Sequence, residues 1–251
     1  MLKSRLSQGQ VTFGVTIGIG SSEVPYALGD VSLDWINFDL QHGVLDIQIA
    51  AAMIQAMSYS QSVPIVRVPS NDLSIINKAL DVGAQAIVVP LVNSAEDAEK
   101  AVQSSMYPPS GIRSWGQRAS VRDPEYAATA NDEIMVIPQI ETELALRNLE
   151  HIVSTEGVDA VFCGPYDLSM SLGVFRQFDS PRFAKALESI VSTCEAHGVA
   201  PGILAPIGPA ERAIDRGFRL ISLGGDLPML TGSVAEALKN ARNASKNRAQ
   251  S

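Results

Sequence analysis

The chain has 251 residues, a normal length for one (β/α)8 barrel, although two small domains also remain possible at this length. Apolar residues make up 46% and charged residues 18%, so the chain can bury a sizeable core and does not resemble a disordered protein. The 19 basic and 27 acidic side chains give a formal net charge of −8, which disfavours binding to nucleic acid or to an anionic membrane.

Eight short apolar runs follow one another along the chain. Each is rich in valine or isoleucine and almost continuously apolar, which is typical of parallel strands covered on both faces. In chain order they are VTFGVTI from Val11, WINFDL from Trp35, VPIVRVP from Val63, AIVVPLV from Ala86, IMVIPQIE from Ile134, AVFCGPYD from Ala160, VAPGILA from Val199 and RLISLGG from Arg219.

Amphipathic stretches lie between these runs. Residues 45–57 place Ile49, Met53 and Met57 at intervals of four, on one face of a helix, and similar spacing recurs in 73–80, 144–152 and 183–194. The alternation predicts a closed (β/α)8 barrel that forms a single domain over residues 1–251, with an open doubly wound sheet as the alternative. Four glycines stand between a helical stretch and the next strand, where a helix end favours positive φ: Gly83, Gly157, Gly198 and Gly217.

Two segments depart from this alternation. Residues 106–132, between the fourth and fifth runs, form a long connection of a kind that is commonly functional or contains short helices. We expect it to lie over the active-site end of the barrel. The polar tail, about residues 243–251 with the sequence ASKNRAQS from Ala244, is expected to be frayed.

The cysteines, the N-terminal segment and the length of the apolar runs favour a cytoplasmic protein that does not bind a membrane. Cys163 and Cys194 have no spacing typical of a zinc site or a disulfide framework, so we interpret them as core thiols in a reducing compartment. The first ten residues, MLKSRLSQGQ, contain no apolar signal region, and the apolar runs are too short to span a bilayer.

Polar side chains occur where several of the predicted strands end. In a barrel of this class the carboxyl ends of the strands carry the chemistry, and none of these side chains is needed to form the barrel itself. In chain order they are Asp39, Gln41 and His42 after the second strand, Arg67 after the third, Gln139 and Glu141 after the fifth, Asp167 after the sixth and Asp226 near the eighth.

The carboxylates of Glu141 and Asp167 follow neighbouring strands. Their oxygens suit Mg²⁺ or Mn²⁺, which bind through one or two carboxylates together with waters and substrate. The alternative is that each carboxylate caps the helix that follows its strand. Thr142 and Ser169 could perform that capping as well, and the pairing across adjacent strands favours a metal site.

Arg67 and His42 have both a functional and a structural interpretation. Arg67 lies in an otherwise apolar strand, where a charge is rarely buried unless it is paired, so it either binds a substrate oxyanion or forms an ion pair with a core carboxylate. His42 is either a general base beside a metal-bound water or a loop histidine satisfied by its surroundings. GVTIGIGSS from Gly14 is neither a dinucleotide fingerprint nor a P-loop, and the predicted strands contain no lysine for a Schiff base.

These residues closely resemble those of the class II pyruvate aldolases of the HpcH/HpaI family, including the 4-hydroxy-2-oxoheptane-1,7-dioate and 2-dehydro-3-deoxyglucarate aldolase types. The resemblance runs from about Gly14 to Gly225, and the combination of PQIET with GPYDLSMSLG, at a 26-residue separation of Glu141 from Asp167, is specific. The matching stretches are FDLQHG, VRVPSND, ALDVGAQAIVVPLVNSAEDAEKAV, YPPSGIRSWG, PQIET and GVDAVFCGPYDLSMSLG.

The resemblance implies a role for each matching residue. Glu141 and Asp167 would hold Mg²⁺, Mn²⁺ or Co²⁺, which pyruvate would chelate through its ketone and carboxylate oxygens. Gln139 and the backbone N–H groups around Tyr166 and Asp167 would position the substrate. Arg67 would stabilise the enolate oxygen, His42 would transfer a proton, and Asp81 would raise the basicity of His42.

The implied partners are a 2-oxoacid, pyruvate or hydroxypyruvate, and an aldehyde, which together form a 4-hydroxy-2-oxoacid. The family also implies a hexamer, a trimer of dimers, in which the last helix is exchanged between neighbours. Thr16, Gln41 and Ser114 depart from residues that family members carry, which leaves the aldehyde open. The alternatives are oxaloacetate decarboxylation or related enolate chemistry on the same site, and a barrel that binds an oxyacid without catalysis.

Overall fold

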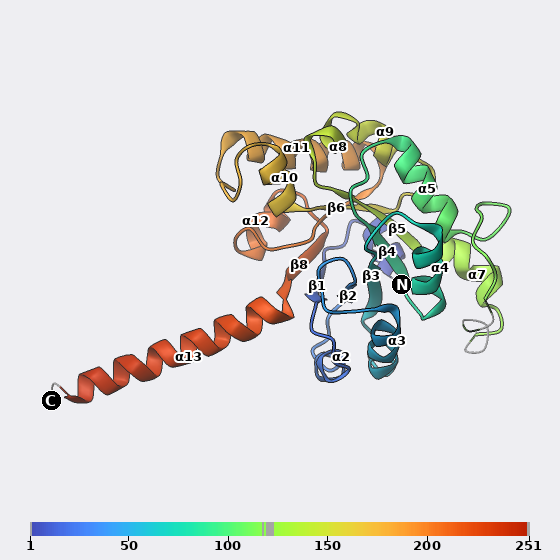
Figure 1. Ribbon diagram of the computed structural model, residues 1–251. Coiled ribbons are helices and arrows are strands. Elements are labelled where there is room, and N and C mark those ends of the chain that lie inside the picture. Colours follow the sequence, from blue (N-terminus) through green and yellow to red (C-terminus); the bar gives the residue numbers. More distant parts are fainter. Residues whose placement is uncertain (1, 117, 119–122, 250–251) are drawn as a thin grey trace.

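Eight parallel strands close into a barrel in the computed structural model, which describes residues 2–116, 118 and 123–249. The strands pair in chain order, and β8 closes the barrel against β1 (Figure 1). This confirms the predicted (β/α)8 fold, and each strand lies within one of the eight apolar runs. The strands are β1 Thr12–Ile17, β2 Trp35–Asp39, β3 Val63–Arg67, β4 Ala86–Val89, β5 Met135–Ile140, β6 Ala160–Cys163, β7 Ala200–Ile203 and β8 Leu220–Gly225.

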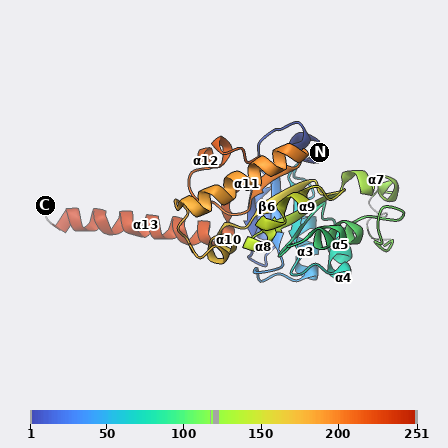
Figure 2. The same ribbon diagram turned by 90° about the horizontal axis from the view of Figure 1, so that it is seen from above.

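Helices surround the barrel because each apolar face must be covered. Figure 1 shows the helices around the strands, and Figure 2 shows the same arrangement turned by 90°. The stretch 144–152, read from the sequence as one helical repeat, is divided at Asn148 into two short helices. The helices are α1 Leu2–Ser7, α2 Glu23–Leu28, α3 Ile47–Ala56, α4 Leu73–Asp81, α5 Ala95–Ser105, α7 Tyr126–Glu133, α8 Glu143–Arg147, α9 Leu149–Val153, α10 Pro165–Ser171, α11 Pro181–His197, α12 Ala210–Asp215 and α13 Asp226–Ala249.

Buried apolar side chains fill the barrel interior. Trp35 packs edge-on against Phe162, with 5.7 Å between ring centroids. Gly14 on β1 makes room for this packing, since a Cβ there would lie 2.2 Å from the Trp35 ring. Leu2 and Leu6 of α1 are buried in the same interior cluster, so the first helix seals one end of the barrel.

The prediction that the connection 106–132 lies over the active-site end of the barrel was wrong. This connection follows α5, not β4, and α5 returns the chain to the amino ends of the strands. There Arg113 binds Asp81, the last residue of α4, with 2.9 Å between Nη2 and Oδ1. Residues 117 and 119–122 of this connection lie outside the described residues.

The C-terminal segment is helical where a frayed tail was expected. Helix α13 continues through Ala249, and residues 250 and 251 lie outside the described part. Its first turns pack against β1 and β8, and the rest extends away from the barrel (Figure 1). Five large apolar side chains of α13 are exposed, those of Leu227, Met229, Leu230, Val234 and Leu238. Among the described helices, none combines the length and apolar character needed to cross a bilayer.

Candidate active site

A cavity of about 500 Å³ lies at the carboxyl ends of the strands. His42, Arg67, Gln139 and Asp167 all line it, so the structure brings together four side chains from four strand ends. A larger groove of about 680 Å³ lies near the amino ends of the strands and contains none of these residues. The mouth cavity is therefore the site at which the predicted chemistry could take place.

Arg67 forms a buried ion pair. Its Nε and Nη2 atoms donate to Asp39 Oδ1 and Oδ2 at 2.9 and 2.6 Å. The two residues lie opposite each other on neighbouring strands, in the same register of the parallel pair β2–β3. Burial alone would raise the pKa of Asp39, but its hydrogen bonds and the charge of Arg67 outweigh burial and lower it. The ion-pair interpretation of Arg67 is thus confirmed, while its position in the cavity still allows contact with a substrate.

Asp39 also shapes the loop that carries His42. Its Oδ1 atom accepts the backbone N–H groups of Gln41 and His42 at 3.0 and 3.2 Å. One carboxylate therefore fixes the guanidinium of β3 and the turn after β2. His42 itself is exposed and lines the cavity, where its ring can reach a bound molecule.

The structure does not bring Asp81 to His42 within one chain. Asp81 ends α4, which runs from the barrel mouth back to the amino ends of the strands, whereas His42 lies at the mouth. The carboxylate of Asp81 accepts a hydrogen bond from Arg113 instead. Arg113 is fully buried and also contacts the rings of Tyr107 and Tyr126, so this group anchors the connection 106–132.

Glu141 is buried beside the cavity and does not cap a helix. Its Oε1 atom accepts the backbone N–H of Leu91 at 2.7 Å, and its Oε2 atom accepts the amide N–H of Gln139. Thr142, not Glu141, caps α8 by accepting from Ala145 N at 3.0 Å. Burial raises the pKa of Glu141, and the nearby charge of Asp167 raises it further.

Asp167 lies in the first turn of α10, on the next strand–helix connection. No side chain caps this helix, which begins after Gly164, and Ser169 lies inside it and donates to the Tyr166 carbonyl. A Cβ at Gly164 would lie 2.8 Å from Gln139 Nε2 and 3.0 Å from Glu141 Oε2. A glycine there lets the ends of β5 and β6 approach closely.

The carboxylate pair fits a hard divalent cation. Glu141 and Asp167 supply oxygen donors, and burial, followed by the charge of Asp167, raises the pKa of Glu141, which a nearby cation would oppose. The described residues contain no group of three or more His, Cys, Asp or Glu side chains that could hold a metal ion. Mg²⁺ and Mn²⁺ do not need such a cluster, because waters and substrate complete their coordination. Gln139 Oε1 is also buried without a partner, so a polar group of a ligand could bind there.

Sequence reasoning did not identify the roles of two residues that position site side chains by hydrogen bonds. Asp39 was noted only as a strand-end residue, and Leu91 was not noted at all. Leu91 has φ of 53°, a left-handed conformation that is rare outside glycine, and its N–H binds Glu141. Asp226 has a structural role, since its carboxylate accepts the N–H groups of Gly18 and Ile19 at 2.9–3.1 Å.

Comparison with known proteins places this geometry among described barrels. Residues 26–232 match the family model described as HpcH/HpaI aldolase/citrate lyase. The chain is 38% identical over 242 residues to 4-hydroxy-2-oxo-heptane-1,7-dioate aldolase from Shigella flexneri, a match that covers 94% of this chain and 90% of that one. It is 36% identical over 230 residues to 5-keto-4-deoxy-D-glucarate aldolase from Salmonella paratyphi C, with 90% of each chain covered.

A solved structure has the same fold over almost its whole length. It is the crystal structure of an HpcH/HpaI aldolase/citrate lyase family protein from Burkholderia cenocepacia J2315. The TM-score is 0.91 at 31% sequence identity, and the match covers 96% of this chain and 98% of that chain. The likeness therefore includes the strand ends that form the mouth cavity.

Proposed function

The chain belongs to the HpcH/HpaI aldolase/citrate lyase family, and we propose that its mouth cavity is the active site of a class II pyruvate aldolase. Relatives at 36–38% identity are named aldolases, so the chain is a carbon–carbon lyase. Its substrates are a 2-oxoacid, pyruvate or hydroxypyruvate, and an aldehyde, which it joins into a 4-hydroxy-2-oxoacid or releases from one. The observation that carries this proposal is the convergence of Arg67, Gln139 and the Glu141–Asp167 pair at one barrel mouth.

Glu141 and Asp167 are the proposed ligands of a divalent cation, Mg²⁺, Mn²⁺ or Co²⁺. When bound, such a cation polarises the ketone of the oxoacid and makes the neighbouring C–H group more acidic. The chemistry of the donors supports this assignment, because both are carboxylates and Thr142 already caps the helix after Glu141. The raised pKa of Glu141 supports it as well, since burial and Asp167 both disfavour its charge until a cation is present.

The other residues of the cavity bind and orient the oxoacid. The backbone N–H groups at Tyr166 and Asp167 hold its carboxylate end, and Gln139, whose amide N–H binds Glu141, helps to position the substrate. The first N–H groups of a helix have no partner within the helix, which makes the start of α10 suitable for an anion. Arg67 stabilises the oxygen on which negative charge develops as the enolate forms.

Proton transfer is assigned to His42. Its exposed position at the mouth gives it access to both substrates, and Asp39 fixes the backbone on which it sits. His42 accepts the C3 proton of the oxoacid, directly or through water, and returns a proton to the aldehyde oxygen after the carbon–carbon bond forms. The role of Asp81 in raising the basicity of His42 stays a prediction, since within one chain Asp81 binds Arg113.

The protein is proposed to act in the cytoplasm as a hexamer, a trimer of dimers that exchange helix α13. Helix α13 extends away from the barrel (Figure 1), and its exposed apolar side chains support this assembly. Val234→Asp would place a charge on that apolar face. Measurement of the molar mass by light scattering should then report smaller species than the wild type forms; an unchanged mass would contradict the exchange.

Two rival functions use the same site differently. Oxaloacetate decarboxylation needs the cation and Arg67 but no aldehyde, whereas a barrel that only binds an oxyacid has no activity to lose. A panel of aldehydes with pyruvate and hydroxypyruvate, in the presence of Mg²⁺, Mn²⁺ or Co²⁺, separates these cases. We expect aldol products that disappear on addition of EDTA, and their absence with every aldehyde would contradict the proposal.

A further inference from the structure

One half of the mouth cavity is apolar. The polar lining residues His42, Arg67, Gln139, Tyr166 and Asp167 follow β2, β3, β5 and β6, and Thr16 lies on β1, between β2 and β8. On the side formed by β7, β8 and α13, the described lining residues are apolar residues and glycines. They include Leu204, Ala205, Pro206, Leu223 and Met229. If the oxoacid occupies the polar half, as the proposed function requires, the aldehyde must approach over the apolar half.

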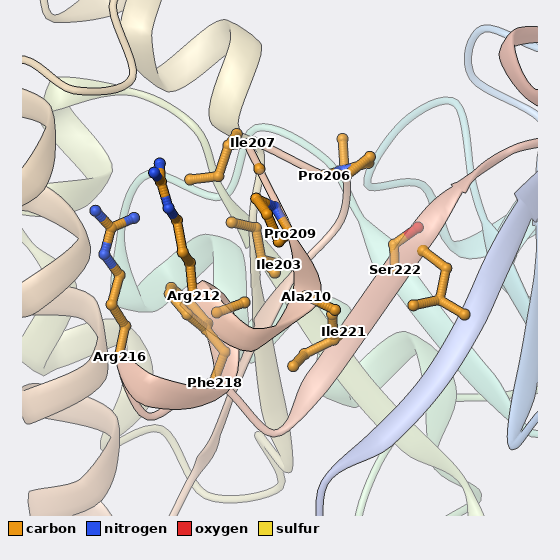
Figure 3. Close-up of a pocket in the computed structure, with 14 residues that line it drawn as sticks. Ile203, Pro206, Ile207, Pro209, Ala210, Arg212, Arg216, Phe218, Ile221 and Ser222 are labelled. Atoms are coloured by element: carbon orange, nitrogen blue, oxygen red, sulfur yellow. The ribbon is translucent and has the colours of Figure 1, made fainter. Parts of the chain in front are cut away.

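Within one chain, the described residues of this half offer no cation to a charged acceptor. Among the described residues that line the cavity, Arg67 is the one lysine or arginine, and its guanidinium is paired with Asp39. Arg212 and Arg216 lie on the far side of the loop 204–209 and line a second cavity. In Figure 3 their guanidinium groups point away from Ile203 and Ile221. Arg212 faces Asp179, with 3.6 Å between Nη1 and Oδ1.

The second cavity extends the apolar surface behind the loop. It has a volume of about 130 Å³ and shares Ala205, Pro206 and Leu223 with the mouth cavity. Ile203, Phe218 and Ile221 form its inner wall (Figure 3). An apolar cavity of about 150 Å³ is large enough to hold benzene, so a short hydrocarbon group fits a space of this size.

We propose that the natural acceptor is an aldehyde with an uncharged, apolar substituent, which packs against Leu204, Leu223 and Met229. This inference rests on the proposed function and names the acceptor class of that same site. The new bond joins C3 of the oxoacid to the aldehyde carbon. The C3 proton passes to the base, the aldehyde oxygen takes up a proton, and nothing is oxidised or reduced. A carboxylate on the substituent would lose hydration without meeting a partner.

The test compares two aldehydes of the same shape. 4-Methylpentanal and 4-oxobutanoate have the same number of non-hydrogen atoms, and a dimethyl end in the first replaces a carboxylate in the second. With pyruvate as donor, wild-type kcat/KM should favour 4-methylpentanal by about tenfold or more. Along the series acetaldehyde, propanal and butanal, kcat/KM should rise by about fourfold per methylene at most.

A charge at Leu223 should change this preference. Leu223→Lys places an ammonium group in the apolar half and should move the ratio of the two aldehydes towards 4-oxobutanoate by about three- to tenfold. Leu73→Lys is the matched control, because Leu73 is 37% exposed against 38% for Leu223 and does not line the cavity. It adds the same net charge and should leave the ratio within about twofold.

Exchange of the pyruvate methyl protons with D2O, without an aldehyde, tests the aldolase function separately from the choice of acceptor. Wild-type exchange together with a preference for 4-oxobutanoate would overturn the apolar acceptor and leave the aldolase intact. An unchanged ratio in a Leu223→Lys enzyme that still exchanges would also overturn it. Absence of wild-type exchange would overturn the proposed function and this inference with it. If Leu223→Lys does not fold, the wild-type ratio alone decides.

Discussion

Arg67 and Asp39 form a two-point ion pair, with Nε–Oδ1 and Nη2–Oδ2 distances of 2.9 and 2.6 Å. The pair uses one edge of the guanidinium, so Nη1 stays available to a substrate oxygen in the cavity that Arg67 lines. The same carboxylate accepts the backbone N–H of His42. A single buried carboxylate therefore orients both the proposed oxyanion donor and the loop of the proposed base.

Removal of Arg67 alone should destabilise the fold. Arg67→Ala leaves Asp39 buried without its counter-charge, which typically costs about 3–5 kcal/mol in the free energy of unfolding. In Arg67→Ala/Asp39→Asn, most of this loss should be recovered, since an asparagine oxygen can still accept the N–H groups of Gln41 and His42. Denaturant titration of the two variants and wild type checks this. Equal stability of Arg67→Ala and wild type would show that the ion pair does not stabilise the fold.

The ion pair should also make stability depend on pH. The folded state lowers the pKa of Asp39, so its ionisation stabilises the fold above the unfolded pKa of about 3.9. This stabilisation is lost as pH falls through the lower, folded pKa. The free energy of unfolding of wild type minus that of Asp39→Asn should thus be constant from about pH 5 to 8 and shrink below about pH 4. A difference that grows as the solution is acidified would contradict the assignment.

Glu141→Gln should abolish metal-dependent turnover without destabilising the metal-free protein. Burial and the charge of Asp167 raise the pKa of Glu141, so the ionised side chain is unfavourable in the absence of a cation. A glutamine can still accept from Leu91 N, and Gln139 can rotate its amide so that its unpartnered oxygen accepts the new N–H group. Thermal unfolding in EDTA should give a Tm equal to or above that of wild type. Calorimetric titration with Mn²⁺ should detect no tight site, and wild-type affinity in the variant would refute the ligand assignment.

Thr16→Trp should change the choice of aldehyde more than the handling of pyruvate. Thr16 lines the mouth cavity, and its hydroxyl accepts from Asn37 at 3.3 Å. An indole at this position would fill part of the cavity and exclude groups that bound there, at roughly 1–3 kcal/mol per methylene excluded. The aldehyde ranking should change while pyruvate proton exchange stays within about threefold. Thr16→Ser is the control, and a ranking common to all three enzymes would show that Thr16 does not contact the acceptor.

The strand pattern was readable from sequence because strands covered on both faces are continuously apolar. The mouth residues could be predicted for a related reason. Parallel strands of a barrel end on one side, so Arg67, Gln139 and Asp167, which lie at or just after three strand ends, must gather there. Spacing alone could not give the partner of Arg67. That partner follows from the register that sets Asp39 opposite Arg67, and register is decided by the whole sheet.

Two predictions from the sequence were wrong, one because the helix α5 was not recognised and one because the C-terminal residues are polar. The helix α5 between β4 and the connection 106–132 was not recognised, so that connection was assigned to the mouth when it lies at the other end. The polar sequence of residues 244–249 suggested a frayed end, yet the helix that begins at Asp226 continues through it. The family expectation for Asp81 cannot be met by direct contact in one chain, because α4 carries it away from His42.

The most direct test of the central claim is proton exchange at the methyl group of pyruvate in D2O, followed by NMR without an aldehyde. Wild type with Mg²⁺ or Mn²⁺ should exchange these protons, and Asp39→Asn, which keeps Arg67, should retain measurable exchange. Arg67→Ala/Asp39→Asn should bind the cation but exchange about 10²–10³ times more slowly than Asp39→Asn, which is typical when one oxyanion donor is removed. Arg67→Lys should recover only part of the rate, since an ammonium lacks the planar fork. If the folded double variant exchanges the protons at the rate of Asp39→Asn, Arg67 does not stabilise the enolate. Its role would then be limited to the ion pair with Asp39.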